Sequence, residues 1–280
     1  MNGERVKKMV RESYGKIVSR GSSCCGPAKS VCGGTDPATD TSRKIGYTDK
    51  DLGTVPEGAN LGLGCGNPVA LATLREGETV LDLGSGAGFD CFLASKRVGD
   101  RGRVIGVDMT PEMVDKAREN VRKGDYRNVE FRLGEIENLP VADSTADAVI
   151  SNCVINLSPD KEKVFQEAFR VLKPDGRLMV SDIVLLKELP DPIKESAEAY
   201  VGCVSGAIGR DEYLRAIEAA GFEKVEVLDE TSFPIEFILN DPLAKSVIEK
   251  SKIPRDKLKE ADRAIASITI CGSKPSRAGG

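Results

Sequence analysis

TVLDLGSGAGFDCFLASKRV, residues 79–98, places a short apolar run, a glycine-rich turn and a helical stretch in immediate succession. Gly84, Gly86 and Gly88 let the chain turn tightly from a strand into a helix, and they let a ligand approach the backbone closely. We therefore predict a strand at 79–83, a helix at 90–98 and a ligand-binding turn between them.

Four more short apolar runs follow this unit, at 103–108, 129–133, 146–152 and 176–182. Helical patterns at 111–123 and 159–172 separate most of them, whereas the connection from 129–133 to 146–152 has the composition of a loop. Strands that alternate with helices are typical of a parallel sheet covered on both faces. The sequence KPDG at 173–176 predicts the end of a helix and a turn before the fifth strand.

The regions on either side of this core are less regular. Before it, apolar residues at helical spacing between Val6 and Ile17 predict a short amphipathic helix, and residues 24–40, rich in Gly, Ser, Cys and Pro, predict a loop or arm. After it, we expect helices and strands at 193–204, 211–220, 223–228 and 266–272, with a helical insertion at 233–262.

The whole pattern predicts an α/β fold organised around one Rossmann-like αβα core. We place that core at 67–185, a cysteine-containing N-terminal arm with part of the substrate site at 1–66, and an α+β C-terminal extension, also part of the substrate site, at 186–280. The last two strands are expected to extend the sheet.

Composition excludes several classes of function. The 280 residues carry a net charge of −4, and their basic residues are scattered among acids, so we expect no nucleic-acid partner. No apolar run approaches the roughly 20 residues of a membrane span, and no apolar leader segment follows the basic N-terminus, so we expect a cytoplasmic protein without a membrane partner. The chain has 8 cysteines and no histidine, which rules out Ser-His and Cys-His nucleophile pairs and mixed His/Cys zinc sites.

The glycine-rich turn and the end of the second strand predict a nucleoside site. Asp108 ends that strand, where a carboxylate can accept hydrogen bonds from both ribose hydroxyls. The same arrangement serves dinucleotides, but their fingerprint needs a small residue where this chain has Phe89. The G-x-G-x-G spacing instead suits a nucleoside without a pyrophosphate.

Cysteines lie at several places where a ligand could bind. Cys153 directly follows the fourth strand, and ligands of open α/β sheets bind beyond the carboxyl ends of the strands. Cys203 lies fifty residues later, and Cys65 lies just before the core. Cys91 and Cys271 are expected to pack as small apolar side chains. A structural zinc site is an alternative for four cysteines, although their spacing is not that of a zinc ribbon; they are Cys24, Cys25, Cys32 and Cys65.

The core motifs resemble those of class I S-adenosylmethionine-dependent methyltransferases. Residues 82–88 are similar to their first motif, Asp108 to their acidic residue, and GEIENLP at 134–140 to their adenine loop. The resemblance implies S-adenosylmethionine as the cofactor, with the Glu135 carboxylate facing the adenine amino group and the Ile136 N–H a ring nitrogen. The complete predicted cofactor set is Asp82, Gly84, Gly86, Gly88, Asp108, Met109, Glu135, Ile136 and Asn152.

Four segments further resemble arsenite methyltransferases: LGCGNP at 63–68, DLGSGAGFDC at 82–91, SNCVINL at 151–157 and YVGCVSGA at 200–207. The resemblance implies that Cys153 and Cys203 bind trivalent arsenic and that Cys65 adds a third thiolate. It also implies that Cys25, or else Cys24 or Cys32, takes part in a redox cycle. Arsenite and methylarsenite are then the substrates, and a thiol reductant such as thioredoxin or glutathione is the partner.

The chemistry of this set is consistent, because trivalent arsenic is soft and prefers thiolates. Three thiolates leave arsenic with a lone pair, which can attack a sulfonium methyl group in line without a general base. One alternative is methylation of carbon, nitrogen or oxygen of a small metabolite, because the core motifs alone do not exclude it. Another is a cysteine-only metal-binding or redox-sensing protein with a vestigial core.

Overall fold

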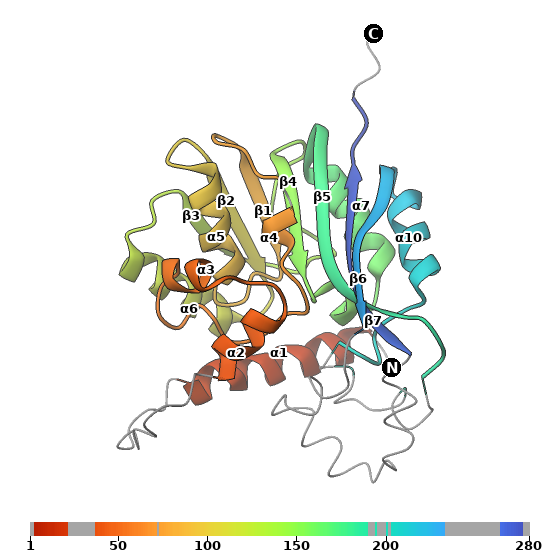
Figure 1. The fold of residues 1–280 in the computed structure, drawn as a ribbon, viewed down its shortest axis with the longest axis horizontal. Helices are drawn as coiled ribbons and strands as arrows, with labels where there is room; N and C mark the ends of the chain where they lie inside the picture. The colour runs from red at the N-terminus through yellow and green to blue at the C-terminus, as the bar shows by residue number, and fades with distance from the viewer. Residues whose placement is uncertain are drawn as a thin grey trace.

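The computed structural model describes residues 3–21, 37–71, 73–189, 194, 200, 203–232 and 264–276. Within these residues the chain builds a seven-stranded sheet in the order β3-β2-β1-β4-β5-β7-β6 (Figure 1). Its strands are β1 Thr79–Leu83, β2 Arg103–Asp108, β3 Val129–Leu133, β4 Ala146–Asn152, β5 Leu172–Leu185, β6 Glu223–Ser232 and β7 Ile265–Ser273.

The sheet is parallel from β3 to β5, and β7 pairs antiparallel with both β5 and β6. The first four strands have the predicted bounds. β1, β2 and β4 are largely buried on both faces, whereas β3, at the edge of the sheet, alternates buried with more exposed side chains. The two C-terminal strands extend the sheet as expected, although each is longer than predicted. The sheet therefore continues past residue 185 into the C-terminal extension.

Helices cover both faces of the sheet, as the alternating pattern predicted. They are α5 Phe89–Val98, α6 Pro111–Gly124, α7 Lys161–Val171 and α10 Arg210–Ala219. Alternate residues of β1 enter two different cores, because side chains of a strand point to opposite faces. Val80 packs in the core that contains residues of α5 and α6, whereas Leu81 packs in the core that contains residues of α7 and α10.

The N-terminal helix α1, Gly3–Gly21, lies across one edge of the sheet (Figure 1). Its predicted apolar face is present: Val6 and Val10 are buried, and they pack in one cluster with Cys65, Leu157 and Cys203. Leu157 follows β4, so α1 covers the carboxyl ends of the parallel strands and not an outermost strand of the sheet. Short helices α2 Pro37–Lys44, α3 Asp49–Thr54, α4 Pro68–Leu71 and the 3-10 turn η1 Ile155–Leu157 complete the described elements.

Two local predictions were wrong. The predicted arm at 24–40 ends earlier, because residues 37–44 form α2. The helix end predicted from 173–176 is confirmed, because α7 ends at Val171. The turn predicted before the fifth strand lies instead within β5, which already pairs at Leu172. The register shifts after Leu172, and Asp175 has a φ of 63°. Most of the predicted helix 193–204 and the segments 24–36 and 233–262 lie outside the described residues, and Cys203 and Val204 lie in a turn.

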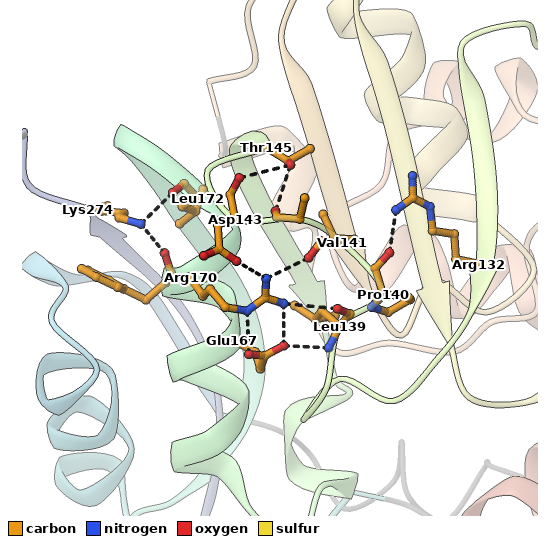
Figure 2. Close-up of polar contacts among 12 residues, drawn as sticks. Arg132, Leu139, Pro140, Val141, Asp143, Thr145, Glu167, Arg170, Leu172 and Lys274 are labelled. Atoms are coloured by element: carbon orange, nitrogen blue, oxygen red, sulfur yellow. Dashed lines mark hydrogen bonds and ion pairs between the residues drawn. The ribbon is translucent and has the colours of Figure 1, made fainter.

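The predicted loop between β3 and β4 is held by one arginine of α7 (Figure 2). The Arg170 guanidinium donates to the carbonyls of Leu139 and Val141 at 3.2 and 2.9 Å and to Asp143 at 2.6 Å. Glu167 binds Arg170 and accepts from the Leu139 N–H at 2.8 Å. These bonds fix the second half of the loop that begins at the predicted adenine segment. None of the helices in the described part of the chain is both long and apolar enough to cross a membrane.

Candidate functional site

The glycine-rich turn connects β1 to α5, and the space beside its backbone is open at one of its three glycines. Gly84, Gly86 and Gly88 all have positive φ, at 68°, 51° and 96°. A Cβ at Gly84 would lie 2.1 Å from Val154, and one at Gly88 would lie 2.6 Å from Phe131, so packing requires glycine there. A Cβ at Gly86 would meet only the Met113 sulfur, at 3.9 Å. A ligand can therefore approach the backbone at Gly86.

Asp108 is fixed beside this turn at the end of β2. Its carboxylate is buried and accepts hydrogen bonds from the N–H groups of Gly86 and Thr110, at 2.9 and 2.8 Å. Burial raises its pKa, and the two backbone donors oppose that rise. A carboxylate has about four acceptor positions, so Asp108 retains capacity for the hydroxyls of a ribose. The open position at Gly86 and this carboxylate fit a nucleoside.

The predicted adenine segment lies under α1. The Glu135 carboxylate pairs with Lys7 at 2.7 Å and with Arg11 at 3.6 Å, and Lys7 also pairs with Glu137 at 3.5 Å. Burial alone would lower the pKa of Lys7, but the two glutamates raise it above its ordinary value. An adenine amino group that donates to Glu135 would bind a carboxylate that already pairs with Lys7 and Arg11. Ile136 and Met109 are partly buried and pack against two different apolar clusters, and both remain candidates for the cofactor set.

Asn152 ends β4, and its amide joins the loop around Cys65 to the sheet. Its side-chain oxygen accepts from the Cys65 N–H at 3.1 Å, and its nitrogen donates to the Gly66 carbonyl at 2.8 Å. The same nitrogen also contacts Tyr47 and Asp90, at 2.9 and 3.2 Å. Asn152 was predicted to bind the cofactor, and the structure shows that its amide already binds these groups.

Tyr47 and Asp90 are site residues that the sequence analysis missed. The Tyr47 hydroxyl donates to the Asp90 carboxylate at 2.5 Å, and both side chains are buried. Burial raises the pKa of Asp90 to about 6, although its two donors oppose the rise. Asp90 lies in the first turn of α5, so this network connects the glycine-rich turn to the Cys65 loop. The position of Asp90 directly after the glycine motif was the available signal.

Asp82, another predicted cofactor residue, is buried close enough to Asp90 to be affected by its charge. Burial raises its pKa well above the ordinary value, and the nearby charge of Asp90 adds to the rise. The Cys91 thiol donates to it at 3.2 Å. Cys91 is completely buried, which agrees with the predicted packing role.

Three cysteines from distant parts of the chain converge beyond the end of β4. The sulfur atoms of Cys65 and Cys153 and a carboxylate oxygen of Asp182 all lie within 4.8 Å of one another. The Cys153 thiol contacts the thiols of both Cys65 and Cys203, and the Cys203 thiol donates to the Cys153 carbonyl at 2.9 Å. Cys65 and Cys203 are buried, whereas Cys153 is partly exposed. Their predicted role as three thiolate ligands matches this arrangement and stays a prediction.

The surroundings of the cluster keep at least two of its thiols protonated. The thiols of Cys203 and Cys65 beside Cys153 raise the pKa of Cys153 well above its ordinary value, and burial raises it further. Burial likewise raises the pKa of Cys65. Each of these thiols loses its proton more readily when its sulfur forms a bond to a thiophilic electrophile. The cluster therefore suits an acceptor that forms bonds to several sulfurs at once.

Asp182 is a buried carboxylate in this cluster that the sequence analysis missed. Its Oδ1 accepts from the Asn156 amide and the Ile183 N–H, both at 2.9 Å, and its Oδ2 accepts from the Tyr213 hydroxyl at 2.9 Å. Burial raises its pKa to about 6. The sequence shows an acid inside the strand pattern of 176–182, and a charged residue in a buried strand was the available signal.

The remaining cysteines do not join the cluster in the described residues. Cys271 lies partly buried in β7, as predicted for a packing residue. Cys24, Cys25 and Cys32 lie outside the described residues, so both the predicted redox role of Cys25 and the zinc alternative remain untested.

The backbone is strained at two of the three clustered cysteines. Cys153 has a φ of 58° and Cys203 a φ of 63°, in the left-handed region that residues other than glycine rarely adopt. Such positions cost of order 1–3 kcal/mol and persist where the surrounding structure enforces them, often at functional sites. The Cys153 N–H donates to the Ser181 carbonyl at 2.8 Å, which helps to hold this conformation.

Comparisons with known proteins identify the family. Residues 74–221 match a family model described as a methyltransferase domain. The chain is 48% identical over 269 residues to an arsenite methyltransferase of Halobacterium salinarum, covering 90% of this chain and 68% of that protein. It is 35% identical over 228 residues to the human arsenite methyltransferase, covering 78% of this chain and 58% of that protein. The chain thus spans little more than half of the human protein.

A solved structure agrees with these relatives. The structure of CrArsM, an arsenic (III) S-adenosylmethionine methyltransferase from Chlamydomonas reinhardtii, is similar with a TM-score of 0.60 and 30% sequence identity. The match covers 88% of this chain and 75% of that chain.

The strained backbone at Cys153 gives a test of stability. We expect Cys153→Gly to be more stable than Cys153→Ala by about 1 kcal/mol, because glycine adopts the left-handed region without a Cβ penalty. The measurement is urea unfolding of both variants. At Cys271, in a regular strand, the order should reverse, with alanine more stable by roughly 0.5–1 kcal/mol. An alanine variant at Cys153 that equals or exceeds the glycine variant would show that this backbone is not strained.

Proposed function

The chain belongs to the arsenite methyltransferase family of S-adenosylmethionine-dependent enzymes, and from this premise we propose that Cys65, Cys153 and Cys203 hold trivalent arsenic while it accepts a methyl group. The observation that carries the proposal is the meeting of these three thiols beyond β4. They come from the loop before the core, the end of a central strand and the C-terminal extension. A cluster of three thiols is a donor set for a soft centre.

Binding of arsenite at this cluster balances without an external base. Arsenous acid carries three hydroxyl groups, and each thiol that bonds to arsenic releases one of them as water together with the thiol proton. The product is a neutral arsenic atom with three sulfur ligands and a lone pair. Raised thiol pKa values therefore do not prevent capture, because each proton leaves with a hydroxyl group.

The cofactor site lies on the neighbouring strands. S-adenosylmethionine supplies a methyl group activated by its sulfonium charge. We assign the ribose to Asp108 and the close backbone approach to Gly86, where the structure leaves room. The cofactor site and the thiol cluster are adjacent. Met109, which follows Asp108, packs against the apolar cluster that contains Cys65 and Cys203. Positioning the acceptor lone pair against the methyl group supplies most of the acceleration.

After transfer, arsenic is formally oxidised, and two electrons must return to it before the next cycle. We propose that cysteine thiols supply them by forming a disulfide, with Cys25 as the first candidate and Cys24 or Cys32 as alternatives. A thiol reductant such as thioredoxin or glutathione would then restore the thiols. The extent of methylation follows from how many cycles the site permits.

The cofactor assignment predicts two losses of affinity. Asp108→Ala removes the ribose acceptor and should weaken cofactor binding by about 1–3 kcal/mol. Gly86→Val places a side chain in the open position beside the backbone and should weaken it at least as much. Calorimetric titration with S-adenosylmethionine measures both. Gly77→Val is the control for backbone strain, because Gly77 also has positive φ, at 85°, but has nothing within 4 Å of a Cβ. Unchanged affinity in both site variants would contradict the assignment.

The arsenic assignment predicts a difference between substrates for Cys65. Arsenite can take three thiolates, whereas monomethylarsenite already has one bond to carbon and can take only two. Cys65→Ser should therefore reduce arsenite methylation by roughly 100-fold, about 2.7 kcal/mol, and change monomethylarsenite methylation by less than about threefold. Product speciation with labelled cofactor measures both rates, with Cys271→Ser as the control. Equal loss on both substrates would show that Cys65 maintains the structure of the site and is not the third ligand.

A further inference from the structure

The thiol cluster contains a fourth donor that trivalent arsenic does not need. A carboxylate oxygen of Asp182 lies within 4.8 Å of the sulfurs of both Cys65 and Cys153. Arsenic bound by three thiolates carries its lone pair at the fourth corner of a tetrahedron, so the carboxylate has no bond to form with it. A ligand that binds four donors, in contrast, could use Asp182 together with the thiols.

The spacing of these donors suits a tetrahedral cation. Metal–sulfur bonds of about 2.3 Å separate the ligands of a tetrahedral zinc ion by about 3.8 Å. Donor atoms that already lie within 4.8 Å of one another need to move by no more than about 1 Å to reach that separation. Cys203 lies outside this group of three donors, but its thiol contacts that of Cys153, so a further shift of Cys203 would complete the set as the fourth ligand.

The carboxylate is held as metal-bound carboxylates usually are. Second-shell hydrogen bonds that orient a ligand are typical of metal sites. Two donors, Asn156 and the Ile183 N–H, fix one oxygen of Asp182, and Tyr213 donates to the other. Because a carboxylate oxygen has two acceptor positions, the Tyr213-bound oxygen still has one available for a cation.

Charge also favours a cation at this place. Once the three thiols have lost their protons to an incoming ion, three thiolates and a carboxylate carry four negative charges. Lys161, which lies near Asp182 and Cys203 and donates to the Ser158 carbonyl at 3.1 Å, offsets one of these charges and opposes a cation to that extent. Three negative charges then remain for a divalent ion to neutralise in part.

We propose that Cys65, Cys153, Cys203 and Asp182 form a tetrahedral site for a thiophilic divalent cation such as Zn²⁺ or Cd²⁺. The inference rests on the proposed function for the identity of the thiol cluster. A cation bound there occupies the position of arsenic, so it inhibits methylation in competition with arsenite and not with the cofactor. The three thiol protons leave to the buffer, so cation binding weakens as pH falls.

The test uses Cd²⁺ and the reduced full-length chain. Cys24, Cys25 and Cys32 are replaced by serine, so that their thiols do not bind the probe. Titration followed by the ultraviolet thiolate-to-cadmium absorption should give one bound ion per chain. Asp182→Asn should weaken Cd²⁺ binding at least tenfold and change arsenite binding, measured by calorimetry, by less than about threefold. A tenfold change corresponds to about 1.4 kcal/mol.

Two further variants keep the outcome interpretable. Tyr213→Phe removes one of three hydrogen bonds that orient Asp182 but leaves the carboxylate, so its Cd²⁺ affinity should fall by less than that of Asp182→Asn. Cys153→Ser should abolish both Cd²⁺ and arsenite binding. Cofactor titration of each variant confirms that it is folded. An Asp182→Asn chain that binds Cd²⁺ as tightly as its parent overturns the inference while arsenite capture still supports the proposed function. Failure of the parent chain to capture arsenite would instead overturn the proposed function.

Discussion

The side-chain amide of Asn152 is the contact on which the geometry of the site depends. It holds the Cys65 loop through the Cys65 N–H and the Gly66 carbonyl, and it lies directly before Cys153. One side chain thus sets the distance between two thiols that are 88 residues apart in the sequence. Tyr47 and Asp90 extend the same network to the helix that follows the glycine-rich turn. The proposed substrate and cofactor sites are therefore connected by buried hydrogen bonds.

Several features of the thiol cluster lower the stability of the folded protein. Two of its cysteines have left-handed backbone, and its thiols and carboxylate are buried where charge is disfavoured. These features oppose folding and are offset by the two well-packed cores on either side of the sheet. In the proposed site, a neutral arsenic–thiolate complex would form with loss of the thiol protons and without added charge, so the buried environment would favour the bound state. The proposed transfer needs no histidine, because the lone pair of arsenic attacks without a general base.

Sequence alone predicted much of the fold, because local patterns determine it. The first four strands have the predicted bounds, since short apolar or alternating runs between turn residues are typical of strands. The turn between β1 and α5 followed from its glycine spacing, and its role in cofactor binding stays a prediction. The meeting of Cys65 and Cys203 at Cys153 did not follow from any local pattern, and only the family resemblance suggested it. Asp182, Tyr47 and Asp90 were missed because their importance comes from tertiary contacts. The helix at 37–44 was missed because its polar composition resembles that of a loop.

The central claim is that one arsenic atom binds all three clustered thiols, and X-ray absorption at the arsenic edge tests it most directly. The sample is the reduced chain with Cys24, Cys25 and Cys32 replaced by serine, loaded with one equivalent of arsenite. The account predicts three sulfur neighbours and no oxygen, with one sulfur fewer after Cys65→Ser. Two sulfurs and an oxygen in the parent chain, or three sulfurs that persist in Cys65→Ser, would contradict it.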